Sequence, residues 1–198
     1  MLFPKAIEDL IIELQKLPSV GPKTAERYAF YLLRQSSEQL QKFAQTIAEL
    51  KEKITICQNC FAIAEKNPCQ TCTDDKRDKT TICIVSDTRD MLSIESIKQY
   101  NGQYHILGGL INTIENIKPE NLNINQLITR VKKYSPKEII LALSPNMEGE
   151  TTSLYLTKIL KPYKIKISRL AKGLPTGTDL EYADEMTLIN ALKYRNEL

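Results

Sequence analysis

The 198-residue sequence has little net charge, no long hydrophobic segment and a single histidine. Its 27 Lys and Arg residues nearly balance its 24 Asp and Glu residues, so the formal charge of +3 argues neither for nor against a nucleic-acid partner. No apolar run approaches the roughly 18 residues of a membrane-spanning helix, which excludes such a helix. The histidine, His105, has no second histidine or acid at a catalytic spacing, and we expect it to support the core or a turn.

The first residues of the chain also lack the features of a secretory signal peptide, because Lys5, Glu8 and Asp9 interrupt the apolar residues there. The proportions of apolar (42%) and charged (26%) residues are typical of a packed, soluble protein and not of a disordered chain. We therefore expect a protein of the reducing cytoplasm.

The five cysteines are an odd number, which argues against a fully disulfide-paired framework. Four of them form two C-x2-C pairs, Cys57 with Cys60 and Cys69 with Cys72, separated by eight residues. Each pair can place two sulfurs on one ion, and two pairs complete the tetrahedron of a structural zinc site. Disulfides, redox dithiols and an iron–sulfur cluster are the alternatives. Cys83 stands in an apolar strand, and we expect it to be buried and inert.

The hydrophobic pattern changes along the chain. Residues 1–53 have apolar side chains at helical spacing, and Ser36 with Gln39 forms a plausible capping box. Residues 57–72 have too few large apolar side chains for a core of their own. From about residue 80, short strands alternate with helices, which is typical of a parallel α/β sheet. We predict strands at 81–85, 105–107, 138–143 and 164–170, helices at 91–97, 127–131 and 154–160, and a loop at 110–123.

A short connection between two predicted helices has the spacing of a helix-hairpin-helix, which binds the DNA backbone without sequence specificity. Gly21 can adopt a positive φ, and Pro22 suits the first helical position. The free N–H groups at the start of such a helix suit a phosphate, and Lys23 and Arg27 share one face. Ser19 stands where the motif usually has its first glycine. An ordinary packing corner between helices is the alternative.

Two segments of the α/β region, 82–87 and 141–150, resemble a Toprim fold. Catalytic Toprim domains carry a Glu after the first strand and a D-x-D-x-x-G-E motif after a later one, and these carboxylates hold Mg²⁺. Here Ser86 occupies the Glu position, and Ser144 and Asn146 occupy the two Asp positions. We therefore expect no cleavage or polymerisation. A Mg²⁺-dependent primase or nuclease, helped by Asp87 and Asp90, is the alternative, although capping a helix explains Asp87 more simply.

Two further charged groups have open interpretations. Glu148 and Glu150 stand at the start of a predicted helix, where acids favour the helix dipole, and they could equally form a docking patch for a basic partner. A run of six basic residues is either a solvated face or the lining of a channel for phosphates. These six are Lys158, Lys161, Lys164, Lys166, Arg169 and Lys172.

Taken in order, these parts resemble the RecR family of bacterial recombination mediators over essentially the full length. The likeness predicts a multi-module α/β fold. Its modules are a helix-hairpin-helix domain (1–53), a four-cysteine zinc finger (54–76), a degenerate Toprim domain (77–172) and a C-terminal tail (173–198). The tail GLPTGTDLEYAD matches the family's, except that Thr178 replaces a second glycine. It has been likened to a Walker B element, but without a P-loop we assign no ATP hydrolysis.

The resemblance implies a non-enzymatic DNA-repair factor of the cytoplasm, associated with the nucleoid. It implies action with RecO, and in many bacteria RecF, to load RecA onto SSB-coated single-stranded DNA at gaps. Family members form homotetrameric rings through their N- and C-terminal regions. By the same resemblance, Cys57, Cys60, Cys69 and Cys72 hold one structural Zn²⁺, Lys23 and Arg27 contact DNA, and Glu148 and Glu150 contact RecO. A scaffold without DNA contact is a further alternative.

Overall fold

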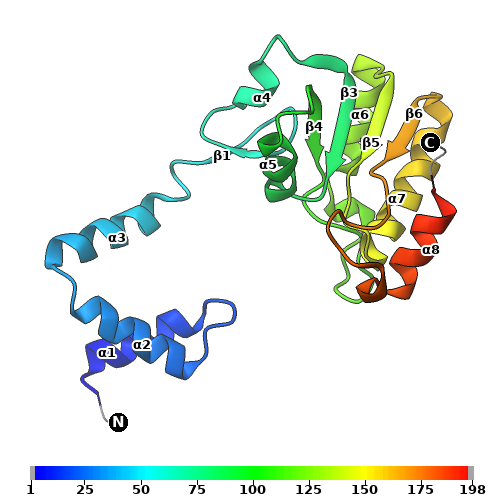
Figure 1. The fold of residues 1–198 in the computed structure, drawn as a ribbon. Helices are drawn as coiled ribbons and strands as arrows, with labels where there is room; N and C mark the ends of the chain where they lie inside the picture. Colours follow the sequence, from blue (N-terminus) through cyan, green and yellow to red (C-terminus); the bar gives the residue numbers. More distant parts are fainter. Residues whose placement is uncertain (1–2, 196–198) are drawn as a thin grey trace. The chain divides into compact units, whose positions relative to one another are not determined.

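The computed structural model describes residues 3–195, so the ends of the first and last predicted modules, 1–2 and 196–198, lie outside it (Figure 1). The chain forms two compact units, Met1–Ile54 and Thr55–Leu198. None of the helices in the described range is long and apolar enough to cross a lipid bilayer.

The first unit is helical, as predicted. It contains α1 (Lys5–Gln15), α2 (Pro22–Leu33) and α3 (Ser37–Glu49). The predicted capping box opens α3, because the Ser36 hydroxyl accepts from the Gln39 N–H (3.3 Å) and the Gln39 side chain accepts from the Ser36 N–H (3.1 Å). In α2, Ala25 and Ala29 are fully buried, and side chains this small let helix backbones approach closely.

The second unit begins with the Cys-bearing segment, which has an antiparallel pair, β1 (Thr55–Ile56) and β2 (Ile63–Ala64), and a short helix α4 (Gln70–Thr73). Strands and helices then alternate as β3 (Asp78–Val85), α5 (Thr88–Ser96), β4 (Gly102–Ile106), α6 (Ile124–Tyr134), β5 (Glu138–Leu141), α7 (Met147–Leu160) and β6 (Lys166–Arg169). The four strands pair in parallel in the order β4-β3-β5-β6. Helix α8 (Glu185–Lys193) follows the tail loop.

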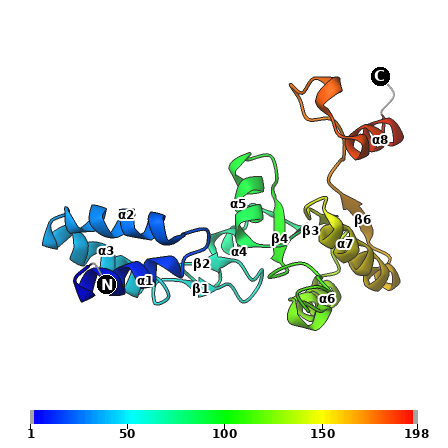
Figure 2. The ribbon, with the colours of Figure 1, turned by 90° about the horizontal axis from the view of Figure 1, so that it is seen from below.

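The central strand β3 has buried side chains on both faces, as its continuous apolar run predicts. Ile82 and Ile84 pack in the core under α6 and α7, whereas Cys83 and Val85 pack in a second core on the opposite face. Figure 2 shows α5 and α6 on opposite sides of the strands. Three of the paired cysteines, Cys57, Cys60 and Cys69, belong to the second core. The Cys-bearing segment therefore shares its hydrophobic core with the sheet.

Several element boundaries differ from the sequence-based expectation. Helix α7 begins at Met147, seven residues before the apolar run at 154–160 but where Glu148 and Glu150 were expected to open a helix, and the Asn146 side chain caps it by accepting from the Gly149 N–H (2.9 Å). Strand β5 ends at Leu141 and not at residue 143. Helix α8, capped by Asp184, has no counterpart among the predicted helices.

The outer edge of β4 is covered by groups from outside the sheet. Four of its outward-facing backbone groups find hydrogen-bond partners there. The pairs are Gly102 O with Arg77 Nη1 (2.9 Å), Tyr104 O with Arg130 Nη1, Ile106 O with Asn123 Nδ2 (3.1 Å) and Ile106 N with Cys60 O (2.8 Å). The last of these ties the Cys-bearing segment to the sheet.

His105 is a core residue, as expected, and no part of its side chain reaches solvent. Its Nε2–H donates to the Asn123 carbonyl (2.8 Å), and Nδ1 has no partner among residues 3–195. Burial lowers the pKa of the imidazole to about 4, with the Arg130 charge contributing in the same direction.

This pKa predicts a loss of stability on mild acidification. The unfolded chain takes up a proton near pH 6.5 and the folded chain only near pH 4, so His105 costs stability as the pH falls through that window. At about pH 5 the loss is about 2 kcal/mol. Urea unfolding at pH 7 and pH 5 should show a weaker pH dependence for His105→Gln, which keeps a donor and does not titrate. The cysteines also titrate, but they are the same in both proteins and contribute equally. An equal pH dependence of the unfolding free energy would therefore show that His105 does not cause the loss.

Candidate metal centre and nucleic-acid interface

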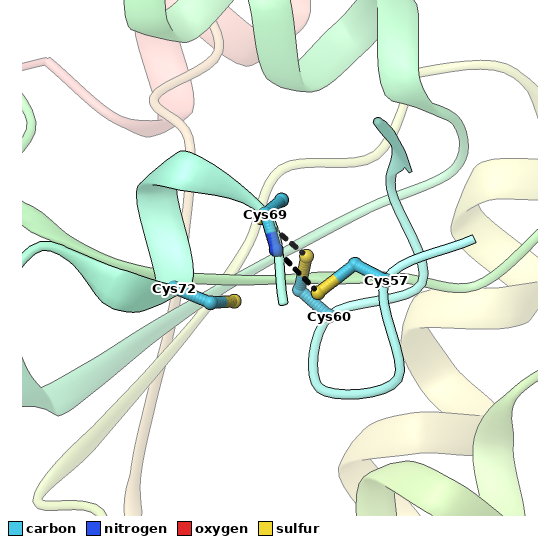
Figure 3. Close-up of side chains that lie close together, drawn as sticks. All are labelled: Cys57, Cys60, Cys69 and Cys72. Carbon is cyan, nitrogen blue, oxygen red and sulfur yellow. Dashed lines mark hydrogen bonds between the residues drawn. The ribbon is translucent and has the colours of Figure 1, made fainter. Parts of the chain in front are cut away.

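The four paired cysteines converge on one point. Their Sγ atoms all lie within 4.8 Å of one another, and only Cys72 is more than slightly exposed. Figure 3 shows Cys57 and Cys60 on one turn, facing Cys69 and Cys72 at the start of α4 and within it. The Cys60 and Cys69 sulfurs are 3.6 Å apart. A tetrahedron with Zn–S bonds of ~2.3 Å has sulfurs about 3.8 Å apart, whereas a disulfide needs ~2.05 Å. The donor set fits a metal ion and is consistent with zinc, for which four-thiolate tetrahedral sites are typical.

The protein backbone supports negative charge at this cluster. Burial raises the pKa of the Cys57 thiol, but N–H groups of Cys69, Cys60 and Asn59 outweigh it and bring that pKa down to about 6. The Cys69 N–H donates to the Cys57 sulfur (3.4 Å). In contrast, burial raises the pKa of Cys83 to about 12, so this thiol stays protonated, in line with the inert role expected of it.

Lys23 and Arg27 lie one turn apart in the first half of α2, and both side chains are exposed. The Lys23 side chain is 97% exposed, and its one ion-pair contact within residues 3–195 is a long one, 3.9 Å to Glu26. Pro22 occupies the first turn, as predicted, and no side chain caps the helix. The first backbone N–H groups of α2 therefore remain available beside the two cations.

The hairpin before α2 does not use its glycine as expected. Gly21 has φ −82° and serves as the N-cap, so the expectation of a positive φ there is wrong. The positive φ, 63°, falls on Ser19. This is the position where the motif usually has a glycine, and the strained conformation explains that preference. The turn has this conformation although its positive-φ residue is a serine and not a glycine.

Two of the three side chains at the degenerate Toprim positions, those of Ser86 and Asn146, have structural partners. The Ser86 hydroxyl donates to the Asp90 carboxylate, and the Asn146 side chain caps α7. Asp87 caps α5 as expected, accepting from the N–H groups of Arg89 (2.8 Å) and Asp90 (3.0 Å).

Glu148 and Glu150 lie in the first turn of α7, as predicted, but their surroundings differ. Glu150 pairs with Arg169 (3.1 Å) and with Lys172, and these contacts hold the pKa of its carboxyl below the usual value. Sequence reasoning missed this pairing, because no spacing rule joins a helix to residues 19 and 22 positions away, one at the end of β6 and one in the loop after it. Lys166 pairs with Glu138 (3.0 Å), so three of the six cations in the basic run have carboxylate partners.

Comparison with known proteins decides the family. The helix-hairpin-helix model of RecR matches residues 7–51, the Toprim domain model matches 80–171, and the C-terminal model of RecR matches 173–196. Recombination protein RecR of Gloeothece citriformis is 46% identical, covering 100% of this chain and 98% of the relative. The RecR proteins of Bifidobacterium animalis subsp. lactis (47%) and Staphylococcus saprophyticus (43%) also cover all of this chain, and it covers 99% and 100% of theirs. The chain belongs to the RecR family.

RecR membership confirms the predicted fold class, with a helical head, a four-cysteine cluster, a parallel Toprim-type sheet and a C-terminal helix. It also supports a role in recombination and repair. The four cysteines that could hold a metal ion lie at 57–72, between the matched helix-hairpin-helix and Toprim segments.

Proposed function

We propose that this RecR-family protein is a non-enzymatic, DNA-binding recombination mediator. It acts with RecO, and with RecF where present, to load RecA onto SSB-coated single-stranded DNA at gaps. The observation that carries the DNA contact is the pair Lys23 and Arg27, both exposed beside the uncapped start of α2. A phosphate there meets two cations and the free N–H groups of the helix. With zinc on four thiolates the formal charge of the chain falls from +3 to +1, so a few placed cations must do the binding.

Removing both cations is expected to weaken DNA binding and its dependence on salt. Lys23→Ala/Arg27→Ala should lower the affinity for gapped DNA by about tenfold or more at ~0.1 M salt. The slope of log K against log salt should become shallower by about 0.9 for each phosphate that the protein no longer neutralises. A gel-shift titration across salt concentrations measures both quantities.

A matched control removes the same charge elsewhere. Lys132→Ala/Lys133→Ala takes two exposed cations from the end of α6, in the other unit. Equal binding and equal salt slope for wild type and Lys23→Ala/Arg27→Ala would remove these two residues from the DNA site. An equal loss of DNA affinity in both double variants would show that the effect comes from the net charge of the chain and not from the position of Lys23 and Arg27.

The non-enzymatic assignment is supported by the structural hydrogen bonds that residues at the Toprim positions make. Ser86 and Asn146 are uncharged and are already engaged with Asp90 and with the Gly149 N–H. Asp87 is engaged in capping α5. Mg²⁺-dependent nicking or priming that is lost on Asp87→Ala would favour the alternative, a Toprim enzyme.

Assembly into a homotetrameric ring is supported by apolar side chains that the single chain leaves uncovered. In the helical unit, a groove of about 470 Å³ is lined by Leu14, Leu17, Tyr28, Tyr31, Leu32, Leu40 and Phe43. In the tail, Tyr182, Met186 and Leu192 are each more than 60% exposed. Exposed apolar groups of this size are typical of protein interfaces. A ring would multiply the two DNA-contacting cations by four.

The proposed RecO contact falls mainly on Glu148, because Glu150 is already paired with Arg169 and Lys172. None of the ion pairs within residues 3–195 involves Glu148. Glu148→Gln should lower RecO affinity about threefold to tenfold at unchanged stability, measured by titration calorimetry. Glu115→Gln, on an exposed loop, is the control. Unchanged affinity in Glu148→Gln would place the contact elsewhere.

The remaining parts of the proposal concern the metal, the modules and the compartment. One structural zinc per chain is held by Cys57, Cys60, Cys69 and Cys72. The modules are 1–53, 54–76, 77–172 and 173–198. The protein works in the cytoplasm at the nucleoid.

A further inference from the structure

One of the four clustered cysteines differs from the other three in its exposure to solvent. Cys57, Cys60 and Cys69 are 0%, 1% and 5% exposed and form part of the second core. Cys72 is partly exposed and packs against that core from outside it. Thiol reagents and competing metal ligands act only on sulfurs that they can reach. The difference therefore makes Cys72 the accessible side of the cluster.

A small pocket connects Cys72 with the surface. Its volume is about 190 Å³, well above the roughly 15 Å³ that one water molecule needs. Asn59, Lys79 and Tyr134 line it and are exposed, whereas Ile82 lines it and is buried. Cys72 is the one residue of the four-cysteine cluster in this lining, and all the lining residues lie in the second unit. Small solutes therefore reach the cluster at Cys72.

The backbone that carries Cys72 is attached to the sheet less directly than the turn at residues 57–60. That turn is tied to β4, because the Cys60 carbonyl accepts from the Ile106 N–H (2.8 Å). Cys72 lies in the single turn of α4 (Figure 3), and its N–H donates to the carbonyl of Cys69, three residues earlier (3.0 Å). A helix of four residues has little stability of its own in water. A local opening can therefore withdraw Cys72 from the cluster while the turn at 57–60 stays on the sheet.

We propose that Cys72 is the exchange ligand of the metal site, at which an ion is loaded and removed by way of this pocket, and the cysteine of the cluster that soft electrophiles modify first. The inference rests on the proposed zinc assignment and adds an order among its four ligands. A ligand that takes the place of Cys72 must be small, to fit the pocket, and soft, to compete with a thiolate. Low-molecular-weight thiols have both properties.

Limited alkylation of the zinc-loaded full chain tests the order. The probe is a substoichiometric amount of iodoacetamide, whose carbon bonds to the sulfur as iodide leaves, and peptide mass spectrometry locates the adduct. Cys72 should react about tenfold or more faster than each of the other three, because their sulfurs become accessible only when the core opens. Equal rates at all four would overturn the proposal. So would first modification of Cys57, whose thiolate the backbone N–H groups favour.

A matched pair of variants tests the pocket as the route. Asn59→Phe enlarges a side chain of the pocket lining, and Gln58→Phe makes the same change at the neighbouring exposed position, which is not part of the lining. The zinc that remains after incubation with a small dithiol is measured by metal analysis of the desalted protein. Loss of zinc should slow about threefold or more in Asn59→Phe and keep the wild-type rate in Gln58→Phe, because exchange depends on access. Equal rates in the three proteins would overturn the proposal.

Metal analysis before each reaction separates this inference from the zinc assignment on which it rests. A wild type that is folded without zinc would refute the assignment, and this inference with it. A wild type that holds zinc, but whose Cys72 reacts no faster than the buried cysteines, would refute this inference alone.

Discussion

Cys60→Ser should lose zinc and much of the stability of the second unit. Cys60 is 1% exposed, its sulfur faces that of Cys69, and its carbonyl accepts from the Ile106 N–H. Apparent binding free energies of structural zinc reach about 10–16 kcal/mol, and a site that loses one of four thiolates forfeits a large part of that. We expect the metal content to fall from about one zinc per chain towards zero and Tm to fall with it.

The fifth cysteine provides the matched control. Cys83 is also buried, at 2% exposure, and lies in the same core, but it is not part of the cluster. Cys83→Ala should keep its zinc and lose only about 1 kcal/mol from the small cavity. Metal analysis of the purified proteins and thermal unfolding by circular dichroism measure both effects. A Cys60→Ser protein with one zinc and an unchanged Tm, or a folded metal-free wild type, would end the zinc assignment.

Gly149→Ala should destabilise the protein by about 2–4 kcal/mol, although alanine is normally the better helix former. A Cβ at this position would overlap the Ser144 carbonyl oxygen and lie 3.0 Å from its carbon and 3.1 Å from Asn146 Oδ1. The backbone of Ser144 cannot move away without disturbing the end of β5 and the Asn146 cap. Replacing glycine by alanine in an exposed helix would raise the free energy of unfolding by about 1 kcal/mol. At Gly149 the same replacement lowers it.

Gly173→Ala is the control for this prediction. Gly173 has nothing within 4 Å of the added Cβ and no positive φ, so its substitution should stay within about 0.5 kcal/mol of wild type. Urea unfolding gives the two free-energy changes directly. A neutral or stabilising Gly149→Ala would show that the turn before α7 adjusts. Gly149 also shows why one part of a catalytic motif persists without the acids: its role is in the packing of the backbone.

Local patterns predict the local features of this molecule well. The apolar run of β3, the caps at Ser36 and Asp87, and the two C-x2-C pairs each depend on residues close in sequence. The apolar pattern of α7 begins only at Leu154, because its first turn holds Glu148, Gly149 and Glu150, and the preference of acids for a helix start is the signal that places this turn. The positive φ falls on Ser19 and not on Gly21, because the residue type shows which residue tolerates a positive φ and not the position at which the turn requires it.

Long-range features could not be predicted from one sequence. The ion pairs of Glu150 with Arg169 and Lys172 join residues whose approach depends on the whole sheet. Arg130 gives no signal, because a single arginine on a helix has no motif around it, yet it covers the edge of β4 and lines a pocket. The core that the cysteines share with the sheet also could not be predicted, because it joins segments that are distant in the sequence.

The covered edge of β4 has a consequence for the protein in the cell. An uncovered edge strand is a template for pairing with another chain, which leads to aggregation. The Cys60 carbonyl that engages Ile106 stays in place only while the cysteine turn is folded, and a metal ion on the proposed site would hold that turn. Loss of that ion would then free the Ile106 N–H, one of the four outward-facing backbone groups of β4 that have partners. A chain without the ion would therefore be more prone to pair with another chain at this edge and to aggregate.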